Sequence, residues 1–208
     1  DPHYYHSNIL KYSNRPFLVG EDVQTWANAQ KDKEAYKAFK PSKASIINMN
    51  ECMIELWNEE VGPEDEVYCL GDFGFASQKN LIDVLERLNG RKHLILGNHD
   101  HAIIKNRDQF IGLNRFLSIR DYREIRVGDQ NIVLFHFPIA SWHHNYRGAW
   151  HLFGHCHGSF PPSGKSVDVG VDAPFVTGSP VYRPYSFLEV KKYMDKQNVM
   201  IVDHHGED

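Results

Sequence analysis

Short apolar runs alternate with amphipathic segments along most of the chain. The runs are rich in β-branched or aromatic residues, and each has the length of a buried strand. They cover residues 67–70, 93–96, 132–137, 149–153 and 167–171. Strands separated by helical segments predict a layered α/β or α+β domain.

Helical spacing of apolar residues marks the segments between these runs. Residues 51–60 repeat apolar side chains on one face, and Asn50 is their expected N-cap. Residues 81–88 show the same spacing more clearly. Near the C-terminus, Ser186 followed by Glu189 matches a capping box, which predicts the start of a third helix.

The length and composition fit one folded domain. A chain of 208 residues buries about 70% of its unfolded surface when it folds as a single unit. Hydrophobic residues at 41% and charged residues at 24% are close to average globular usage. We therefore expect one domain over residues 1–208, with residues 198–208 as a C-terminal tail.

The charge and the cysteines narrow the possible partners and compartments. A formal net charge of -4 provides no basic field, so an extensive nucleic-acid surface is not expected. No apolar run approaches the roughly 20 residues that cross a bilayer, so no membrane partner is expected. Three cysteines at unrelated spacings favour a reduced, cytoplasmic location. Nothing in the sequence indicates an oligomeric state.

Polar residues follow the apolar runs at the points where strands should end. Gly71-Asp72 follows the first run, and Gly97-Asn98-His99-Asp100 follows the second. His136 occurs in a similar position on a later strand. Layered α/β domains build ligand sites at the carboxyl ends of their strands. Carboxylate, amide and imidazole groups together suit Mn²⁺, Fe or Zn²⁺ better than Mg²⁺ or Ca²⁺.

Two further motifs complete an ordered set. Asp1-Pro2-His3 opens the chain, and Gly154-His155-Cys156-His157 comes after His136. In this order, over residues 1 to about 172, the motifs resemble those of the calcineurin-like metallophosphoesterase family, in particular its small bacterial and phage members. The resemblance implies an α+β fold with four layers, α/β/β/α, in which two mixed sheets form a β-sandwich flanked by helices. In that family a buried strand precedes the first Asp, which predicts a strand upstream of Asp1.

The resemblance also implies a site for two divalent metal ions, which would be Mn, Fe, Zn or Ni, with Mn favoured. Asp72 is expected to bridge the two ions. One ion would be held by Asp1, His3, Asp72 and His157, and the other by Asp72, Asn98, His136 and His155.

The function implied by the resemblance is hydrolysis of a phosphomonoester or phosphodiester by a hydroxide that the two ions activate. The substrate would be a small phosphate ester or a nucleotide-like molecule. His99 matches the catalytic histidine of the family. Asp100 is expected to orient that imidazole, and the alternative is a local turn or cap. A non-catalytic, metal-binding interaction scaffold of the same fold is the second interpretation, and the presence of His99 weighs against it.

Other side chains leave more than one interpretation open. Arg15 could grip a phosphate through two hydrogen bonds or could form a surface salt bridge. His6 could support the site from behind the ligands or could face solvent in a loop. Asp168 and Asp172 flank an alternating segment, so we expect them at a strand edge or turn and not in catalysis. Cys156 lacks the downstream Arg of cysteine-dependent phosphatases, so it is expected only to pack.

Overall fold

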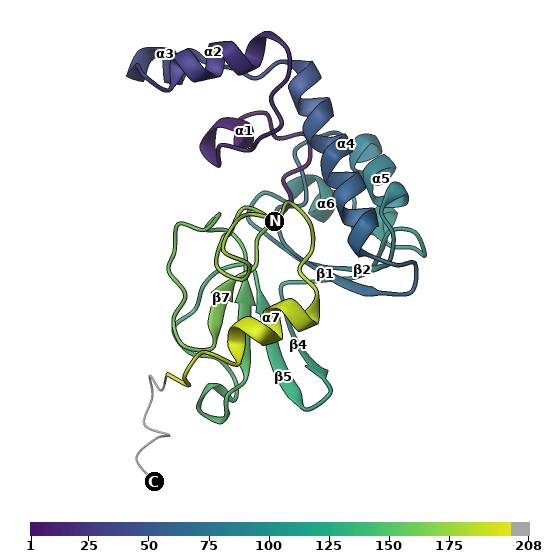
Figure 1. Cartoon of the computed structure of the whole chain (residues 1–208). Coiled ribbons are helices and arrows are strands. Elements are labelled where there is room, and N and C mark those ends of the chain that lie inside the picture. The colour runs from purple at the N-terminus through teal and green to yellow at the C-terminus, as the bar shows by residue number, and fades with distance from the viewer. Residues whose placement is uncertain (201–208) are drawn as a thin grey trace.

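The computed structural model describes residues 1–200, which form two β-sheets with helices packed against them (Figure 1). The helical segments are α1 Ile9–Tyr12, α2 Glu21–Ala29, α3 Lys33–Ala38, α4 Lys43–Glu60, α5 Gln78–Arg87, α6 His101–Lys105, η1 Arg107–Phe110, η2 Asn145–Arg147 and α7 Phe187–Met194. The strands are β1 Glu66–Leu70, β2 Arg91–Ile95, β3 Phe116–Arg120, β4 Tyr122–Val127, β5 Gln130–Phe135, β6 Trp150–Phe153 and β7 Ser166–Asp168. The expected mixed α+β class with two helix-flanked sheets is confirmed.

The first sheet has the order β1-β2-β3, and its described strands are all parallel. The expectation of two mixed sheets is therefore wrong for this sheet. Its strands are joined by helical crossovers, which keep successive strands pointing the same way. Because Leu70 pairs with Ile95, β1 and β2 end side by side. The loops after both strands, which carry Asp72 and Asn98, consequently leave the same edge of the sheet.

Helices α4 and α5 cover one face of the first sheet and lie side by side (Figure 1). Met49, Met53 and Trp57 of α4 share a buried cluster with Leu81 and Leu85 of α5. Burial of a side chain of this size contributes about 1.5–3 kcal/mol, so this face provides much of the stability of the sheet. Helices α2 and α3 lie apart from it and share a small cluster of their own.

Helix α4 begins earlier than expected, so the assignment of Asn50 as its N-cap is wrong. The N-cap is Ser42, whose side chain accepts a hydrogen bond from the backbone N–H of Ser45. Asn50 is buried in the middle of the helix, and its Oδ1 accepts a hydrogen bond from Tyr5 N at 2.9 Å. The first turns were missed because their buried face includes polar Ser45, which interrupts the hydrophobic pattern.

The second sheet has the order β4-β5-β6-β7 and is mixed, because β4 and β5 are antiparallel whereas the other pairs are parallel. The predicted capping box is present at the start of α7, where Ser186 and Glu189 exchange hydrogen bonds. Val190 and Met194 of α7 belong to a buried cluster that includes residues of both sheets. Helix α7 thus stabilises the contact between the sheets.

A largely apolar cavity of about 560 Å³ lies between the two sheets. Val67 of β1, Leu134 of β5 and Phe187 of α7 line it, and so do Asp1 and Pro2. The other expected metal ligands do not line it, so the candidate chemistry is located elsewhere. The strand expected upstream of Asp1 remains a prediction.

The five predicted strand regions all contain strands, whereas β3 and β4 were not predicted. In β4 only Arg123 and Ile125 are partly buried, and the other residues are exposed. The segment therefore lacks the continuous apolar run by which the five predicted strands were identified. Within residues 1–200, no helix has both the length and the apolar character needed to span a bilayer. Of the expected C-terminal tail, residues 201–208 lie outside the described part of the chain.

Candidate metal centre

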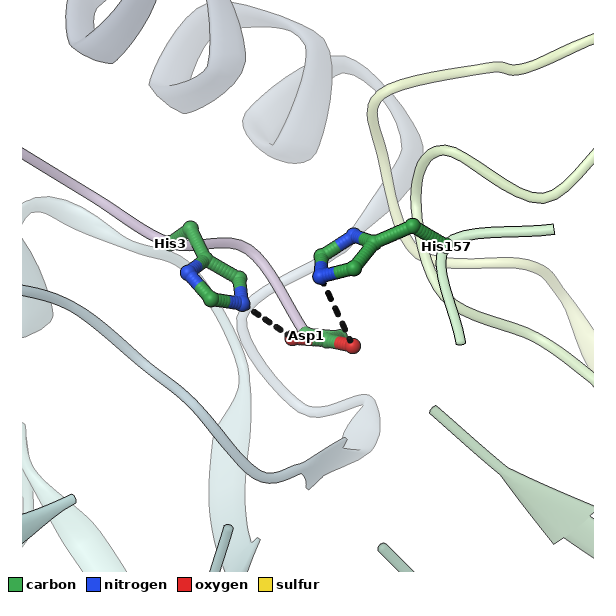
Figure 2. Close-up of side chains that lie close together, drawn as sticks. All are labelled: Asp1, His3 and His157. Carbon is green, nitrogen blue, oxygen red and sulfur yellow. Dashed lines mark ion pairs between the residues drawn. The ribbon is translucent and has the colours of Figure 1, made fainter. Parts of the chain in front are cut away.

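Three side chains from distant parts of the chain meet where the loops of the two sheets converge. Asp1 and His3 belong to the N-terminal segment, and His157 lies in the loop after β6. Their potential ligand atoms all lie within 4.8 Å of one another. In Figure 2 the two imidazoles approach opposite ends of the Asp1 carboxylate, with His3 Nε2 2.8 Å from Oδ1 and His157 Nε2 3.8 Å from Oδ2.

Asp72 lies between this cluster and a second group of expected ligands. Its Oδ2 is 3.6 Å from His3 Nε2 and 3.7 Å from His136 Nε2. Its other oxygen, Oδ1, accepts a hydrogen bond from the backbone N–H of His99 at 2.7 Å. One carboxylate oxygen therefore faces histidines from both halves of the site, while the other oxygen is fixed by the backbone.

His136, Asn98 and His155 form the second group. His136 Nδ1 lies 2.7 Å from the carbonyl oxygen of Leu70 and donates to it, which leaves Nε2 without a proton. That Nε2 is 3.0 Å from Asn98 Oδ1, so two acceptor atoms face the same point. The His155 ring centroid is 5.1 Å from that of His136. All seven expected ligands are thus brought into one continuous site.

The arrangement of the donor atoms suits coordination of a metal ion better than hydrogen bonding between the side chains. Within the described part of the chain, the buried atoms Asp1 Oδ1 and His3 Nε2 have no hydrogen-bond partner, although they are 2.8 Å apart. Two ligands bound to one ion at about 2.0–2.2 Å lie about 2.9–3.5 Å apart. Buried polar atoms without partners are costly in a native structure. A cation between these atoms would remove that cost.

Three of the expected histidine ligands, His3, His136 and His155, are held in the neutral form that a metal ligand requires. Burial lowers the pKa of His3 to about 2 and that of His136 to about 4. Burial also lowers the pKa of the more exposed His155. At neutral pH these imidazoles therefore present unprotonated nitrogens, and the carboxylates beside them do not form ordinary salt bridges with them.

Four of the expected ligands have a backbone conformation that L-residues rarely adopt. Positive φ angles of 55° at His3, 47° at Asp72, 63° at His155 and 46° at His157 place these residues in the left-handed region. Each such residue costs about 1–3 kcal/mol, and such strain is concentrated at functional sites. The concentration of strained residues in one ligand set indicates that the surrounding structure maintains this geometry against a local cost.

Gly97 allows the loop after β2 to pack closely against the loop after β1. A Cβ atom at Gly97 would overlap with the carboxylate and the backbone nitrogen of Asp72. The two loops at the ends of β1 and β2 can therefore approach only because this position has no side chain.

Asp100 does not orient His99, so that prediction is wrong. Its Oδ2 accepts hydrogen bonds from the backbone N–H groups of Asp72 at 2.9 Å and Gly97 at 2.8 Å, and its Oδ1 accepts one from Phe73 at 2.8 Å. These bonds occupy the carboxylate and connect the loops after β1 and β2. Asp100 therefore holds the loops that carry Asp72 and Asn98.

His99 and His6 both contact the ring of Phe75. The His99 side chain is exposed, and its ring centroid is 4.9 Å from that of Phe75. His6 stacks on Phe75 at 4.1 Å, and its Nδ1 is 3.2 Å from His3 Nδ1. This contact favours the interpretation in which His6 supports a ligand from behind.

Arg15 is in the wrong place to grip a substrate phosphate. Its side chain has 0% relative exposure and forms a two-point salt bridge with Asp172. The alternative of a surface salt bridge is also wrong, because this pair is buried. The cause is that the segment after the first motif turns inward beneath the site instead of remaining in a surface loop.

Asp172 is a site residue that the sequence did not identify. It is buried, and its Oδ2 lies 2.8 Å from His157 Nδ1. Burial alone would raise the pKa of this carboxyl, but the Arg15 guanidinium and His157 hold the pKa below its ordinary value. Asp168, by contrast, accepts hydrogen bonds from the backbone N–H groups of Gly158 and Gly170 and has a turn-stabilising role, as expected.

Comparison with known proteins gives relatives whose names assign no activity. No family model matches the chain. The uncharacterized protein MJ1445 of Methanocaldococcus jannaschii is 29% identical over 209 aligned residues, which cover 96% of this chain and 91% of that protein. The Gene 66 protein of Mycobacterium phage D29 is 33% identical over 147 residues, covering 58% of this chain and 74% of the phage protein. The Gene 66 protein of phage L5 is 30% identical over 149 residues, covering 58% and 72%.

The chain belongs to the family of these phage Gene 66 proteins. A solved structure, that of the protein of unknown function AQ665 from Aquifex aeolicus, has a TM-score of 0.56 at 21% identity, covering 92% of this chain and 95% of that chain. This likeness shows a shared fold.

Proposed function

We propose that the chain is a metal-dependent hydrolase of phosphomonoesters or phosphodiesters, related to the calcineurin-like metallophosphoesterases and sharing their four-layer fold. The observation that carries this proposal is the position of Asp72 Oδ2, 3.6 Å from His3 Nε2 and 3.7 Å from His136 Nε2. An oxygen between two groups of neutral imidazoles is suited to bridging two cations, and paired cations are a recurrent device of phosphoester hydrolysis.

The donor set defines which ions the site would hold and how. Asp1, His3 and His157 would bind one ion, Asn98, His136 and His155 would bind the other, and Asp72 would be shared. Mixed imidazole and oxygen donors suit Mn²⁺, Fe, Zn²⁺ or Ni²⁺, and we favour Mn²⁺. When bound, such ions would neutralise phosphate charge and activate water for attack on phosphorus.

The site has buried ligands on one side and exposed side chains on the other. Asp1, His3, Asp72 and His136 are buried. Asp1 accepts a hydrogen bond from the backbone N–H of His155, and Asp72 accepts one from the backbone N–H of His99. Asn98, His99 and His155 are exposed, so a small phosphate ester would approach from their side. There the His99 imidazole would stabilise charge on the phosphoryl group or donate a proton to the leaving oxygen.

A direct test begins with metal content and one crossed activity screen. Purified protein would be stripped with a chelator, loaded separately with Mn²⁺, Fe²⁺, Zn²⁺, Co²⁺ or Ni²⁺, and assayed for bound metal by elemental analysis. Each form would then be assayed with monoesters, linear diesters, cyclic nucleotides and short nucleic acids. We expect two equivalents of metal and metal-dependent release of phosphate or alcohol.

The variant His99→Asn separates catalysis from metal binding. We expect it to keep both equivalents of metal and to lose at least about 100-fold in turnover, the lower limit for general acid–base catalysis. His143→Asn is the matched control, because His143 is exposed and contacts Glu124 away from the site. Full turnover in His99→Asn would remove this residue from the mechanism. Metal-loaded protein that is inactive on the whole panel would favour the scaffold interpretation instead.

A further inference from the structure

Asp172 and Arg15 contact the ligand cluster of Asp1, His3 and His157 that Figure 2 draws. His157 Nδ1 lies 2.8 Å from Asp172 Oδ2, and an ionised carboxylate can only accept, so His157 carries its proton on Nδ1. The unprotonated Nε2 then faces Asp1 Oδ2, 3.8 Å away. The carboxylate therefore sets both the tautomer and the direction of this imidazole.

Arg15 fixes that carboxylate in turn. Its Nε donates to Asp172 Oδ1 at 2.8 Å, and its Nη2 donates to Oδ2 at 2.7 Å. Side-chain exposures of 0% and 3% show that the pair is enclosed. This planar, two-point contact allows one orientation of the carboxylate, which lysine would not enforce.

The same guanidinium also reaches the other two ligands of the cluster through the backbone. Its Nη1 donates to the carbonyl oxygen of Pro2 at 2.7 Å, and Pro2 connects Asp1 to His3. Arg15 thus contacts the N-terminal ligand segment directly and His157 through Asp172. Arg15 is therefore one buried contact shared by three ligands that are far apart in the sequence.

A buried ion pair of this kind is poor evidence for a stabilising role. The cost of removing two charges from water can exceed their attraction, and apolar replacements are often equally stable. Met49 and Met53 already surround the guanidinium, with their sulfurs 3.6 Å and 3.4 Å from Nη1. One side of the guanidinium is therefore apolar, and the polar groups that the pair contacts belong to the ligand cluster: the Pro2 carbonyl and His157 Nδ1.

We propose that Arg15 and Asp172 are positioning residues for one metal position, the one formed by Asp1, His3 and His157, and not for the position formed by Asn98, His136 and His155. This inference rests on the proposed metal centre and deepens it. Partners behind the ligands of a metal site typically change its affinity by 10–100-fold. The two positions should therefore respond differently when the pair is changed.

The test is a titration of apo protein with Mn²⁺, followed by calorimetry and by electron paramagnetic resonance. The wild type should bind two equivalents and give the signal of a coupled ion pair. Asp172→Asn should weaken one equivalent by 10–100-fold, leave the other within about 2-fold, and give the signal of an isolated ion. Arg15→Lys should have the same selective effect, because it keeps the charge and removes the two-point contact.

Two further variants keep the test decisive. Arg15→Met with Asp172→Leu removes both charges together, so it should remain folded while losing the same equivalent, even if a single variant fails to fold. Glu189→Gln disrupts another arginine–carboxylate pair, the one between Arg183 and Glu189 of α7, and should leave both equivalents unchanged. Two unaltered equivalents in folded Asp172→Asn would overturn this inference and leave the proposed function intact. A wild type that binds no metal would overturn the proposed function itself.

Discussion

At the scale of single residues, the candidate centre combines expected ligands with strained backbones and a carboxylate, that of Asp100, which hydrogen-bonds to the backbone around them. His3, Asp72, His155 and His157 all have positive φ, which costs about 1–3 kcal/mol for each residue. Asp100 offsets part of that cost by accepting three backbone hydrogen bonds around Asp72. These hydrogen bonds therefore hold the backbone around Asp72 in its strained conformation.

The substitution Gly97→Ala tests the close packing of the loops after β1 and β2. The new methyl group would overlap with Asp72, so we expect the loops to separate, the free energy of unfolding to fall by about 1–3 kcal/mol, and the bound metal to decrease. Chemical denaturation and elemental analysis measure the two effects. Gly112→Ala is the control, because its Cβ would approach Arg115 no closer than 4.0 Å. Equal metal content in the Gly97 and Gly112 variants would show that the loops can separate without loss of the site.

Sequence reasoning at this scale identified the expected ligands that the structure brings together, and it did not identify the residues behind them. The expected ligands could be recognised because each motif either follows an apolar run or opens the chain. Arg15 and Asp172 are 157 positions apart, and Asp172 is 15 positions from His157, so only the folded chain brings them together. Asp100 was misassigned because adjacency to His99 in sequence gives no information on which donors its carboxylate meets.

At the scale of elements, α4 contributes to the site through one buried side chain. Asn50 Oδ1 accepts the backbone N–H of Tyr5, two residues after His3. A long helix packed on the first sheet thereby holds the N-terminal ligand segment. The hydrophobic pattern gave the second half of α4 correctly, but it could not separate an N-cap from a buried polar contact, because both use the same side-chain chemistry.

We expect Asn50→Ala to weaken both stability and metal binding. The partly buried N–H of Tyr5 would lose its acceptor, which costs about 1 kcal/mol, and the His3 segment would lose this attachment to α4. Denaturation and Mn²⁺ titration measure these effects. Asn48→Ala is the matched control, because this residue donates from the same helix to the Phe17 carbonyl instead. The role assigned to Asn50 would fail if both variants bound Mn²⁺ with equal affinity.

Helix α7 should give a pH-dependent contribution to stability. Hydrogen bonds from Arg183 lower the pKa of Glu189 to about 2, from 4.5 in the unfolded chain. A lowered folded-state pKa stabilises above pH 4.5, and this stabilisation is lost as pH falls from 4.5 toward 2. We expect wild type to exceed Glu189→Gln by less than about 1 kcal/mol above pH 4.5, because the pair is partly exposed. Denaturation at several pH values should show this difference narrowing with acidity, and a constant difference would exclude the ion pair as its source.

At the scale of the whole molecule, the candidate centre joins three separate parts of the fold. Asp1 and His3 come from the N-terminal segment, Asp72 follows a strand of the first sheet, and His136 and His157 follow strands of the second sheet. The mixed α+β class was predictable because strand and helix patterns alternate along the chain. The wholly parallel first sheet was not, because strand direction depends on the crossovers and on the unpredicted strand β3.

Metal removal should therefore loosen the contact between the sheets and not only empty a surface site. An ion that binds only the folded state adds about 2.7 kcal/mol when its free concentration is 100 times Kd. For a chain of this size that corresponds to a rise in Tm of about 5–10 °C for each ion. Calorimetry of chelator-treated protein before and after Mn²⁺ addition measures the rise. Hydrogen exchange should show its largest gain in protection in the loops around Asp72, His136 and His157. A His155→Ala, His157→Ala double variant should lose most of the rise, and an unchanged rise in that variant would place the stabilising ion elsewhere in the molecule.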